Sequence, residues 1–241
     1  MKSSSQLTRP NGERISCSEN LLPASTSVDT FGGKIHIEWD AEAPVTPMGQ
    51  LPFFIQFIKL GGRFAPWVKD CPLTYLSNNA PQKVDVLGSL FLSILSGHNR
   101  YTHITTLISD SVNPALLGMK KVVSEDSARR AVKKIDEKNG IMWLQHHLLD
   151  CCEPLLQTPW ILDVDTTVKP LYGHQEDAVK GYNPQKPGRP SHTYHTYMMA
   201  NLRLILDVEV KPGDASHSSH SLPGLTTLLN RLPSNGKPEF V

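Results

Sequence analysis

Two aspartates occur in a run of strand-forming residues past the middle of the chain. Asp163 and Asp165 belong to "WILDVDTTVKPLYGHQE", residues 160–176. A carboxylate is costly inside a buried strand unless a cation compensates it. Successive side chains of a strand point to opposite faces, so Asp163, Asp165 and Thr167 are predicted to share one face. Such a pair suits Mg²⁺, which takes one or two carboxylates together with water and substrate phosphate.

The spacing alone also allows an ordinary interpretation of these two acids. They could lie at an exposed end of the strand, in solvent or paired with Lys or Arg. Other metal or nucleophile sites are not indicated. No cysteines stand at zinc spacing beside a histidine pair, and no G-x-S-x-G elbow occurs.

The composition is that of a globular protein. The 241 residues are 39% hydrophobic and 20% charged, with a formal net charge of +1, which excludes a disordered tail or a strongly basic nucleic-acid coat. The chain begins with polar residues rather than a signal peptide, and no window reaches the ~20 apolar residues of a membrane span. The 4 cysteines form no C-x-x-C pair. We therefore expect a cytoplasmic protein without disulfides or a membrane segment.

The first two thirds of the chain is mainly helical in pattern. Gly61-Gly62 and Gly97 are expected to end two apolar helices, and Ser124 is expected to cap a third that Asn139-Gly140 closes. Pro154 is expected to end or kink the helix after that. The predicted elements are a short strand at 32–40 and helices at 51–64, 84–97, 103–109, 124–140 and 141–156.

After Pro159 the pattern changes to strands. Strands are predicted at 160–168, 192–201 and 202–214, then a helix at 221–232 with Ser221 as cap and Pro223 in its first turn. Residues 239–241 resemble the start of another strand. The predicted fold class is α+β in two parts. We assign 1–30 as a flexible N-terminus, 31–157 as a helical region for DNA binding or dimerisation, and 158–241 as an α/β domain.

Several of these segments resemble one family. The strand "WILDVDTTVKPLYGHQE" is followed by "GYNPQKPGRPSH", "YHTYMMANLRLILDVEVKPGD" and "LPGL". This succession is similar to the catalytic domain of DDE-type transposases of bacterial insertion sequences. The upstream "ILSGHNRYTHITTLISDSVNPALLGMKKVVSEDSARRAVKKI" resembles the helical amino-terminal region of that family. The resemblance covers roughly residues 50–241.

The resemblance implies an RNase H-like catalytic fold, here incomplete, with three strands, a helix and the start of a fourth strand. Asp165 aligns with the first metal-binding acid, and Asp163 is the alternative or a supporting partner. The implied cofactor is Mg²⁺ or Mn²⁺. The implied activity is DNA strand cleavage and transfer that moves an insertion sequence. Element ends and target DNA are the implied partners, and the complete protein is expected to be a nucleoid-associated homodimer.

The chain departs from the family pattern in one respect. The second family Asp is expected just after the strand that begins at 239, and the Glu well beyond it, so neither falls within residues 1–241. We therefore expect a truncated transposase fragment that is inactive alone. The alternative is a non-catalytic DNA-binding remnant or regulator that binds element ends. Asp207, Glu209 and Asp214 are expected to be structural or solvated.

Two basic segments are candidates for DNA contact. The first is the helix predicted at 124–140, where the basic side chains are expected near one face; the second is the connection "KGYNPQKPGRPSH". A solvated helix face and a cover for the sheet edge are the ordinary alternatives. The predicted DNA-binding residues are Arg129, Arg130, Lys133, Lys134, Lys186 and Arg189.

Overall fold

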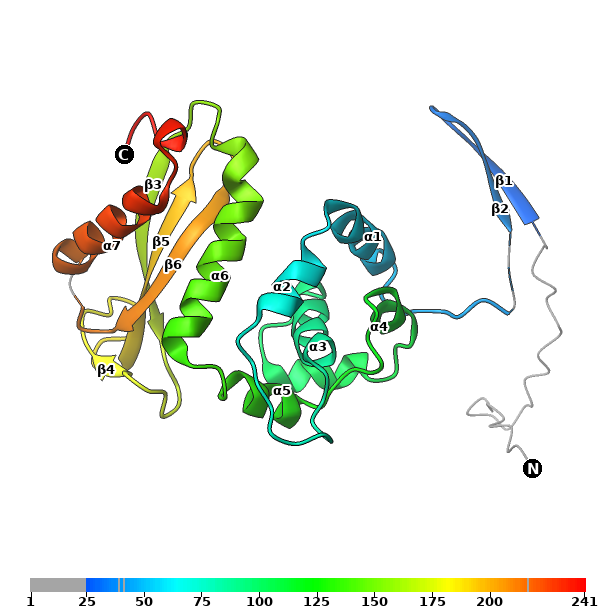
Figure 1. Ribbon diagram of the computed structural model, residues 1–241, viewed down its shortest axis with the longest axis horizontal. Coiled ribbons are helices and arrows are strands. Elements are labelled where there is room, and N and C mark those ends of the chain that lie inside the picture. Colours follow the sequence, from blue (N-terminus) through cyan, green and yellow to red (C-terminus); the bar gives the residue numbers. More distant parts are fainter. Residues whose placement is uncertain (1–24, 39, 41, 216) are drawn as a thin grey trace, which may run out of the picture. The chain divides into compact units, whose positions relative to one another are not determined.

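The computed structural model describes residues 25–38, 40, 42–215 and 217–241. The chain divides into two compact units, Met1–Val45 and Thr46–Val241. In the first, β1 (Ser25–Thr30) and β2 (Gly33–Glu38) form an antiparallel hairpin (Figure 1). β1 covers Ser25–Thr30 of the segment that we predicted to be flexible, and residues 1–24 lie outside the described residues. The predicted division at residue 157 stays a prediction.

The second unit begins with a group of short helices. Its core contains fully buried side chains such as Leu73, Val86, Leu92 and Ile104. The left-handed backbone at Gly62 (φ 65°) follows α1, and Gly97 (φ 77°) follows α3, as the glycine signals predicted. The elements are α1 (Leu51–Gly61), α2 (Phe64–Asp70), α3 (Lys83–Leu95), η1 (Tyr101–Leu107), α4 (Val112–Leu116) and α5 (Glu125–Val132).

The single helix predicted at 124–140 is wrong. Ser124 caps α5 as expected, because its hydroxyl accepts a hydrogen bond from the Ser127 N–H at 3.3 Å. The helix ends at Val132, and a new helix, α6 (Glu137–Cys152), starts under its own cap. The Asp136 carboxylate accepts from the Asn139 N–H at 3.0 Å, which places Asn139 in the first turn of α6 rather than at a helix end.

The remaining chain forms an antiparallel sheet. β3 (Leu162–Pro170) pairs with β5 (Pro190–Met199), and β5 pairs with β6 (Leu204–Pro212), with a register shift between Tyr197 and Met198. The short β4 (Val179–Lys180) pairs with the start of β5. A parallel bridge joins Ile161 to Phe240, so the expected beginning of a further strand is present beside β3.

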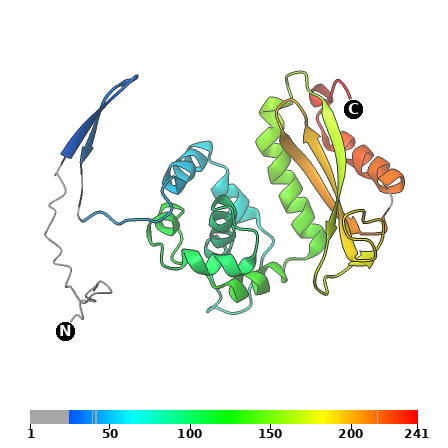
Figure 2. The same ribbon diagram turned by 180° about the vertical axis from the view of Figure 1, so that it is seen from behind.

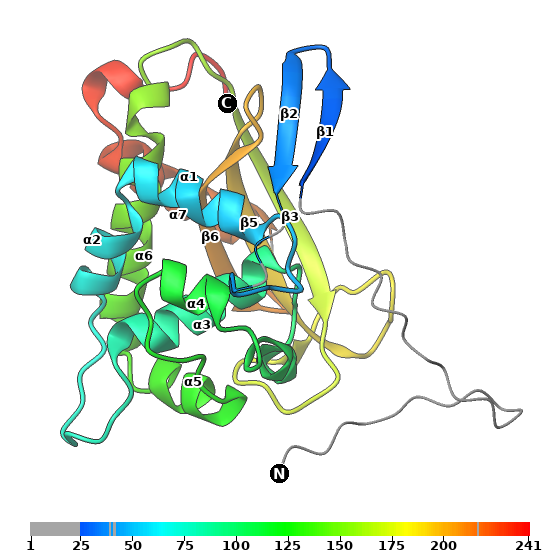
Figure 3. The same ribbon diagram turned by 90° about the vertical axis from the view of Figure 1, so that its right-hand side faces the viewer.

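The two faces of this sheet differ. The face we call the closed face carries buried residues of alternate strand positions, including Leu162, Tyr197 and Met199. α6 and α7 (His217–Arg231) lie on this side of the sheet, as the views in Figures 2 and 3 show. The other face, which we call the open face, carries Asp163 and Asp165. The alternation predicted for β3 is therefore confirmed.

The last helix differs from its prediction at its start. α7 begins at His217, so Ser221 is not its cap and Pro223 lies inside the helix. The short η2 (Glu153–Leu155) follows α6 and contains Pro154, while η3 (Ser234–Gly236) follows α7. The chain is a mixed α+β protein, as predicted. Within the described ranges, none of the helices has the length and apolar character to cross a bilayer.

Candidate acidic site and basic surfaces

The candidate acids lie on the open face of β3. Asp163, Asp165 and Thr167 are all exposed and alternate with half-buried Val164 and Thr166. The Thr167 hydroxyl donates to Oδ2 of Asp165 at 3.5 Å, the long limit for such a bond. Among the described residues, neither aspartate forms an ion pair with Lys or Arg. Asp165 lies within the strand rather than at its end.

These residues offer a divalent cation only part of a coordination shell. In the described part of the chain, no group of three or more His, Cys, Asp or Glu side chains is arranged to hold a metal ion. Asp165, with Asp163 beside it, fits the one or two carboxylates that Mg²⁺ takes when water and phosphate oxygens supply its other ligands. The arrangement suits a cation that arrives with a phosphate-bearing partner.

The segment at residues 239–240 runs beside the same strand. The Leu162 N–H donates to the carbonyl of Phe240 at 2.9 Å, and the Glu239 N–H donates to the carbonyl of Trp160 at 2.9 Å. Because the pairing is parallel, this segment heads in the direction of Asp163 and Asp165. At this point β3 has neighbours on both edges, β5 on one and residues 239–240 on the other.

The basic residues near α5 do not form the continuous helix face that the sequence predicted. Arg129 and Arg130 lie in the last turn of α5, whereas Lys133 and Lys134 follow the helix. All four are exposed. Arg129 lies 3.8 Å from a carboxylate oxygen of Glu125, and its Cζ is 5.5 Å from the ring centroid of Tyr101. This basic surface is therefore interrupted and partly neutralised.

The other two predicted DNA-binding residues come together over one aromatic ring. Nζ of Lys186 lies 5.1 Å, and Cζ of Arg189 4.5 Å, from the ring centroid of Tyr172. The ring is exposed. The sequence did not predict a role for Tyr172, because its contacts with Lys186 and Arg189 join opposite ends of a long connection. The only available signal was its position in a segment that also contains Lys, Arg, Gly and Pro.

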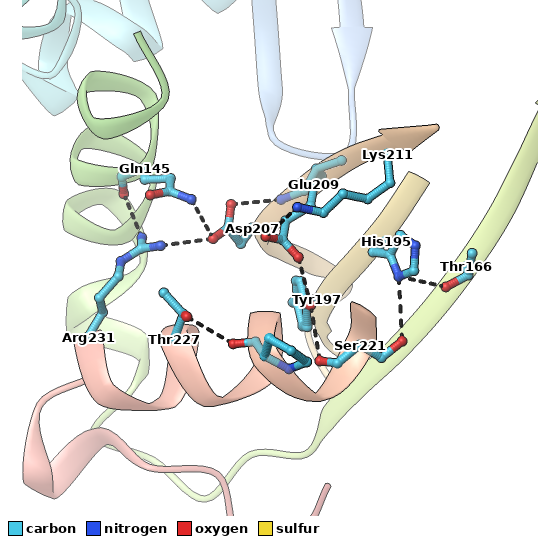
Figure 4. A network of polar contacts seen from close by, with 12 residues as sticks. Gln145, Thr166, His195, Tyr197, Asp207, Glu209, Lys211, Ser221, Thr227 and Arg231 are labelled. Atoms are coloured by element: carbon cyan, nitrogen blue, oxygen red, sulfur yellow. Dashed lines mark hydrogen bonds and ion pairs between the residues drawn. The ribbon is translucent and has the colours of Figure 1, made fainter. Parts of the chain in front are cut away.

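The acids on β6 have structural partners, in agreement with their predicted role. Figure 4 shows Asp207 between α6 and α7, where its Oδ2 accepts from Arg231 at 2.8 Å and from Gln145 at 2.9 Å. The Tyr197 hydroxyl donates to Glu209 at 3.1 Å. Burial, followed by the charge of Glu209, raises the pKa of Tyr197 well above its ordinary value. The contacts of Asp207 join α6 and α7 to the sheet, whereas the contact between Tyr197 and Glu209 joins β5 to β6.

His195 is another polar residue enclosed on the closed face. The hydroxyls of Thr166 and Ser221 lie 3.2 and 3.5 Å from its Nδ1 (Figure 4). Its side chain is completely buried. The three residues belong to β3, β5 and α7, so this group also connects the layers of the domain.

A pocket beside α6 does not include the acidic site. It has a volume of about 540 Å³ and is bordered mainly by apolar and aromatic side chains of α1, α2, α3 and α6 and by the edge of β6. Phe64, Trp67 and Leu144 are among its lining residues, and Asp163 and Asp165 are not. Both acids are exposed at the surface of the protein.

Comparisons of the chain with models of protein families, with curated proteins and with solved structures gave no match.

Proposed function

We propose that this chain is the amino-terminal part of a DDE-type DNA transposase with an RNase H-like catalytic domain. The observation that carries the proposal is the pair of exposed aspartates on the open face of β3, with a parallel segment directed toward them. An acid on that neighbouring strand would lie beside Asp165, as metal-dependent phosphodiester chemistry requires. The order of the three long strands β3, β5 and β6, followed by α7 and then by the bridge at Phe240, supports the same interpretation.

In this proposal the residues of the chain bind and position DNA. Asp165 is the ligand for Mg²⁺ or Mn²⁺, and Asp163 supports it or replaces it. When bound, such an ion polarises a phosphodiester and neutralises developing charge. Lys186 and Arg189 contact the DNA backbone, and Arg129, Arg130, Lys133 and Lys134 form a second, weaker basic surface. Within residues 1–241, Asp165 is the acid matched to the family motif.

The second candidate function is DNA binding without catalysis, as in a regulator that occupies element ends. The exposed cations of the connection between β3 and β5 favour it, because DNA binding needs them and not the acids. The two candidates predict different behaviour toward divalent cations in the presence of DNA.

Mn²⁺ binding, followed by electron paramagnetic resonance, separates the candidates. For the transposase we expect a short DNA duplex to strengthen Mn²⁺ binding to the protein, since phosphate oxygens complete the coordination shell. Asp165→Asn should remove that gain, whereas Asp214→Asn, at another exposed acid, should leave it intact. DNA binding that is equally strong in all variants, with no Asp165-dependent Mn²⁺ binding, would support the non-catalytic candidate and contradict the transposase.

A further inference from the structure

We propose that Tyr172, Lys186 and Arg189 form a phosphate-binding site for the DNA backbone, in which the tyrosine ring holds the two cations in position. The inference rests on the proposed DNA-binding function and adds a residue and a structural role to it. Both cationic groups lie within 5.1 Å of the same ring centroid. A cation over an aromatic face is attracted by the electrons of the ring.

The charges of these two side chains are not neutralised by neighbouring acids. In the part of the chain that the structure describes, Arg63, Arg129, Lys211 and Arg231 each have a carboxylate within 4.0 Å, but Lys186 and Arg189 have none. Contact with Tyr172 leaves N–H donors of both groups available, because an ammonium group has three donors and a guanidinium group five, and one tyrosine ring and its hydroxyl cannot occupy them all. Two uncompensated cations held together favour an anion between them, and phosphate is such an anion.

The backbone that carries the two cations is itself fixed. The Lys186 N–H donates to the side-chain carbonyl of Asn183 at 3.0 Å, and Asn183 is buried. The Arg189 N–H then donates to the carbonyl of Lys186 at 3.2 Å, with Gly188 in a left-handed conformation at φ 76°. This turn presents both side chains on one short segment. A pre-organised pair of donors loses less conformational entropy on binding than two independent surface side chains.

The site lies within reach of a DNA strand bound at Asp165. Tyr172 follows Asp165 by seven positions, so at about 3.3 Å per residue the two are at most roughly 23 Å apart. That span corresponds to about seven steps of duplex DNA at about 3.4 Å per step. A duplex engaged at the aspartate therefore has phosphates that can reach the tyrosine-held cations. We assign the backbone, not the bases, because phosphate contacts come from Lys and Arg without sequence readout.

A double-mutant cycle on the full chain tests the role of the ring. Affinity for a labelled duplex of arbitrary sequence is measured by fluorescence anisotropy at several salt concentrations. We expect Tyr172→Leu to weaken binding about three- to fivefold, the scale of an exposed cation–π contact. Tyr172→Phe keeps the ring and should retain affinity to within about twofold. In the Lys186→Gln/Arg189→Gln background, Tyr172→Leu should have no further effect, since its partners are already absent.

Two comparisons control the cycle. Tyr182→Leu removes a more exposed tyrosine of the same connection, which has no described cation over its ring, and should leave affinity unchanged. Lys186→Gln/Arg189→Gln should lower the slope of log affinity against log salt by about two, one for each phosphate contact. Unchanged thermal unfolding in every variant would show that the fold is intact.

The outcomes separate this inference from the function on which it rests. Suppose that the wild-type chain binds DNA, and that Tyr172→Leu weakens binding equally in both backgrounds or in neither. That result would overturn the tyrosine-held site and leave the proposed function standing. A wild-type chain that binds no duplex at low salt would overturn both.

Discussion

The acidic residues on the closed and open faces of the same sheet differ in their burial and in their partners. On the closed face, Asp207 contacts both Arg231 and Gln145, and the Tyr197 hydroxyl contacts Glu209. On the open face, Asp163 and Asp165 are exposed and have no described ion pair. Buried polar groups need partners to avoid a desolvation cost, whereas exposed ones do not. The difference separates acids that hold the fold together from acids that remain available to a ligand.

The largest expected contrast comes from two neighbouring methionines of β5. Met199 is fully buried on the closed face, and Met198 is half-buried on the open face. Met199→Ala should lower the free energy of unfolding by about 2–5 kcal/mol, since it removes core contacts and leaves a cavity. Met198→Ala should cost less than about 1 kcal/mol. Urea denaturation of both variants measures the difference, and equal costs would contradict the assignment of the two faces.

A glycine of α7 allows the helix to approach the closed face. A Cβ at Gly224 would overlap the Tyr197 hydroxyl and the Glu209 carboxylate. Because the Tyr197 ring is buried and cannot move freely, Gly224→Ala should destabilise the protein by about 1–3 kcal/mol, despite the better helix propensity of alanine. Thr226→Ala, on the exposed side of the same helix, is the control and should be neutral or slightly stabilising. Thermal unfolding of the pair distinguishes close packing from a general effect of substitution in α7.

The Tyr197 hydroxyl gives the closed face a dependence on alkaline pH. Burial, and then the charge of Glu209, raises its pKa in the folded protein above the ordinary value of about 10. A raised pKa means that the folded state favours the protonated hydroxyl. The contribution of this hydroxyl to the free energy of unfolding is therefore complete below pH ~10 and is lost as pH rises from there toward the folded pKa. Tyr197→Phe should cost about 1 kcal/mol at pH 7 through the lost hydrogen bond, and this difference should shrink above pH ~10. A difference that stays constant up to pH 11 would contradict the role of ionisation.

The sequence predicted those elements whose signals are local. Gly62 and Gly97 marked two helix ends, and alternation on β3 placed Asp163 and Asp165 together on one face. The prediction failed where a second local signal competed, since Asp136 starts a new helix inside the expected one. The role of Tyr172 was not predictable, because Lys186 and Arg189 reach its ring only after the connection between β3 and β5 has folded.

The smallest effect on stability is expected for an acid of the open face. It gives the most direct comparison with the acids of the closed face. Asp165→Asn should change the free energy of unfolding by no more than about 0.5 kcal/mol, since the carboxylate is exposed and its one described hydrogen bond is long. Asp207→Asn is the matched variant; it should cost about 1–3 kcal/mol, because it removes the charged partner of Arg231 from a buried site. Urea denaturation at neutral pH compares the two variants.

A loss of unfolding free energy at Asp165 as large as that at Asp207 would mean that Asp165 supports the fold. An aspartate that stabilises the folded sheet in this way would be a weaker candidate for metal binding. If Asp165→Asn leaves stability unchanged and also abolishes DNA-dependent Mn²⁺ binding, the carboxylate is required by the ligand and not by the fold.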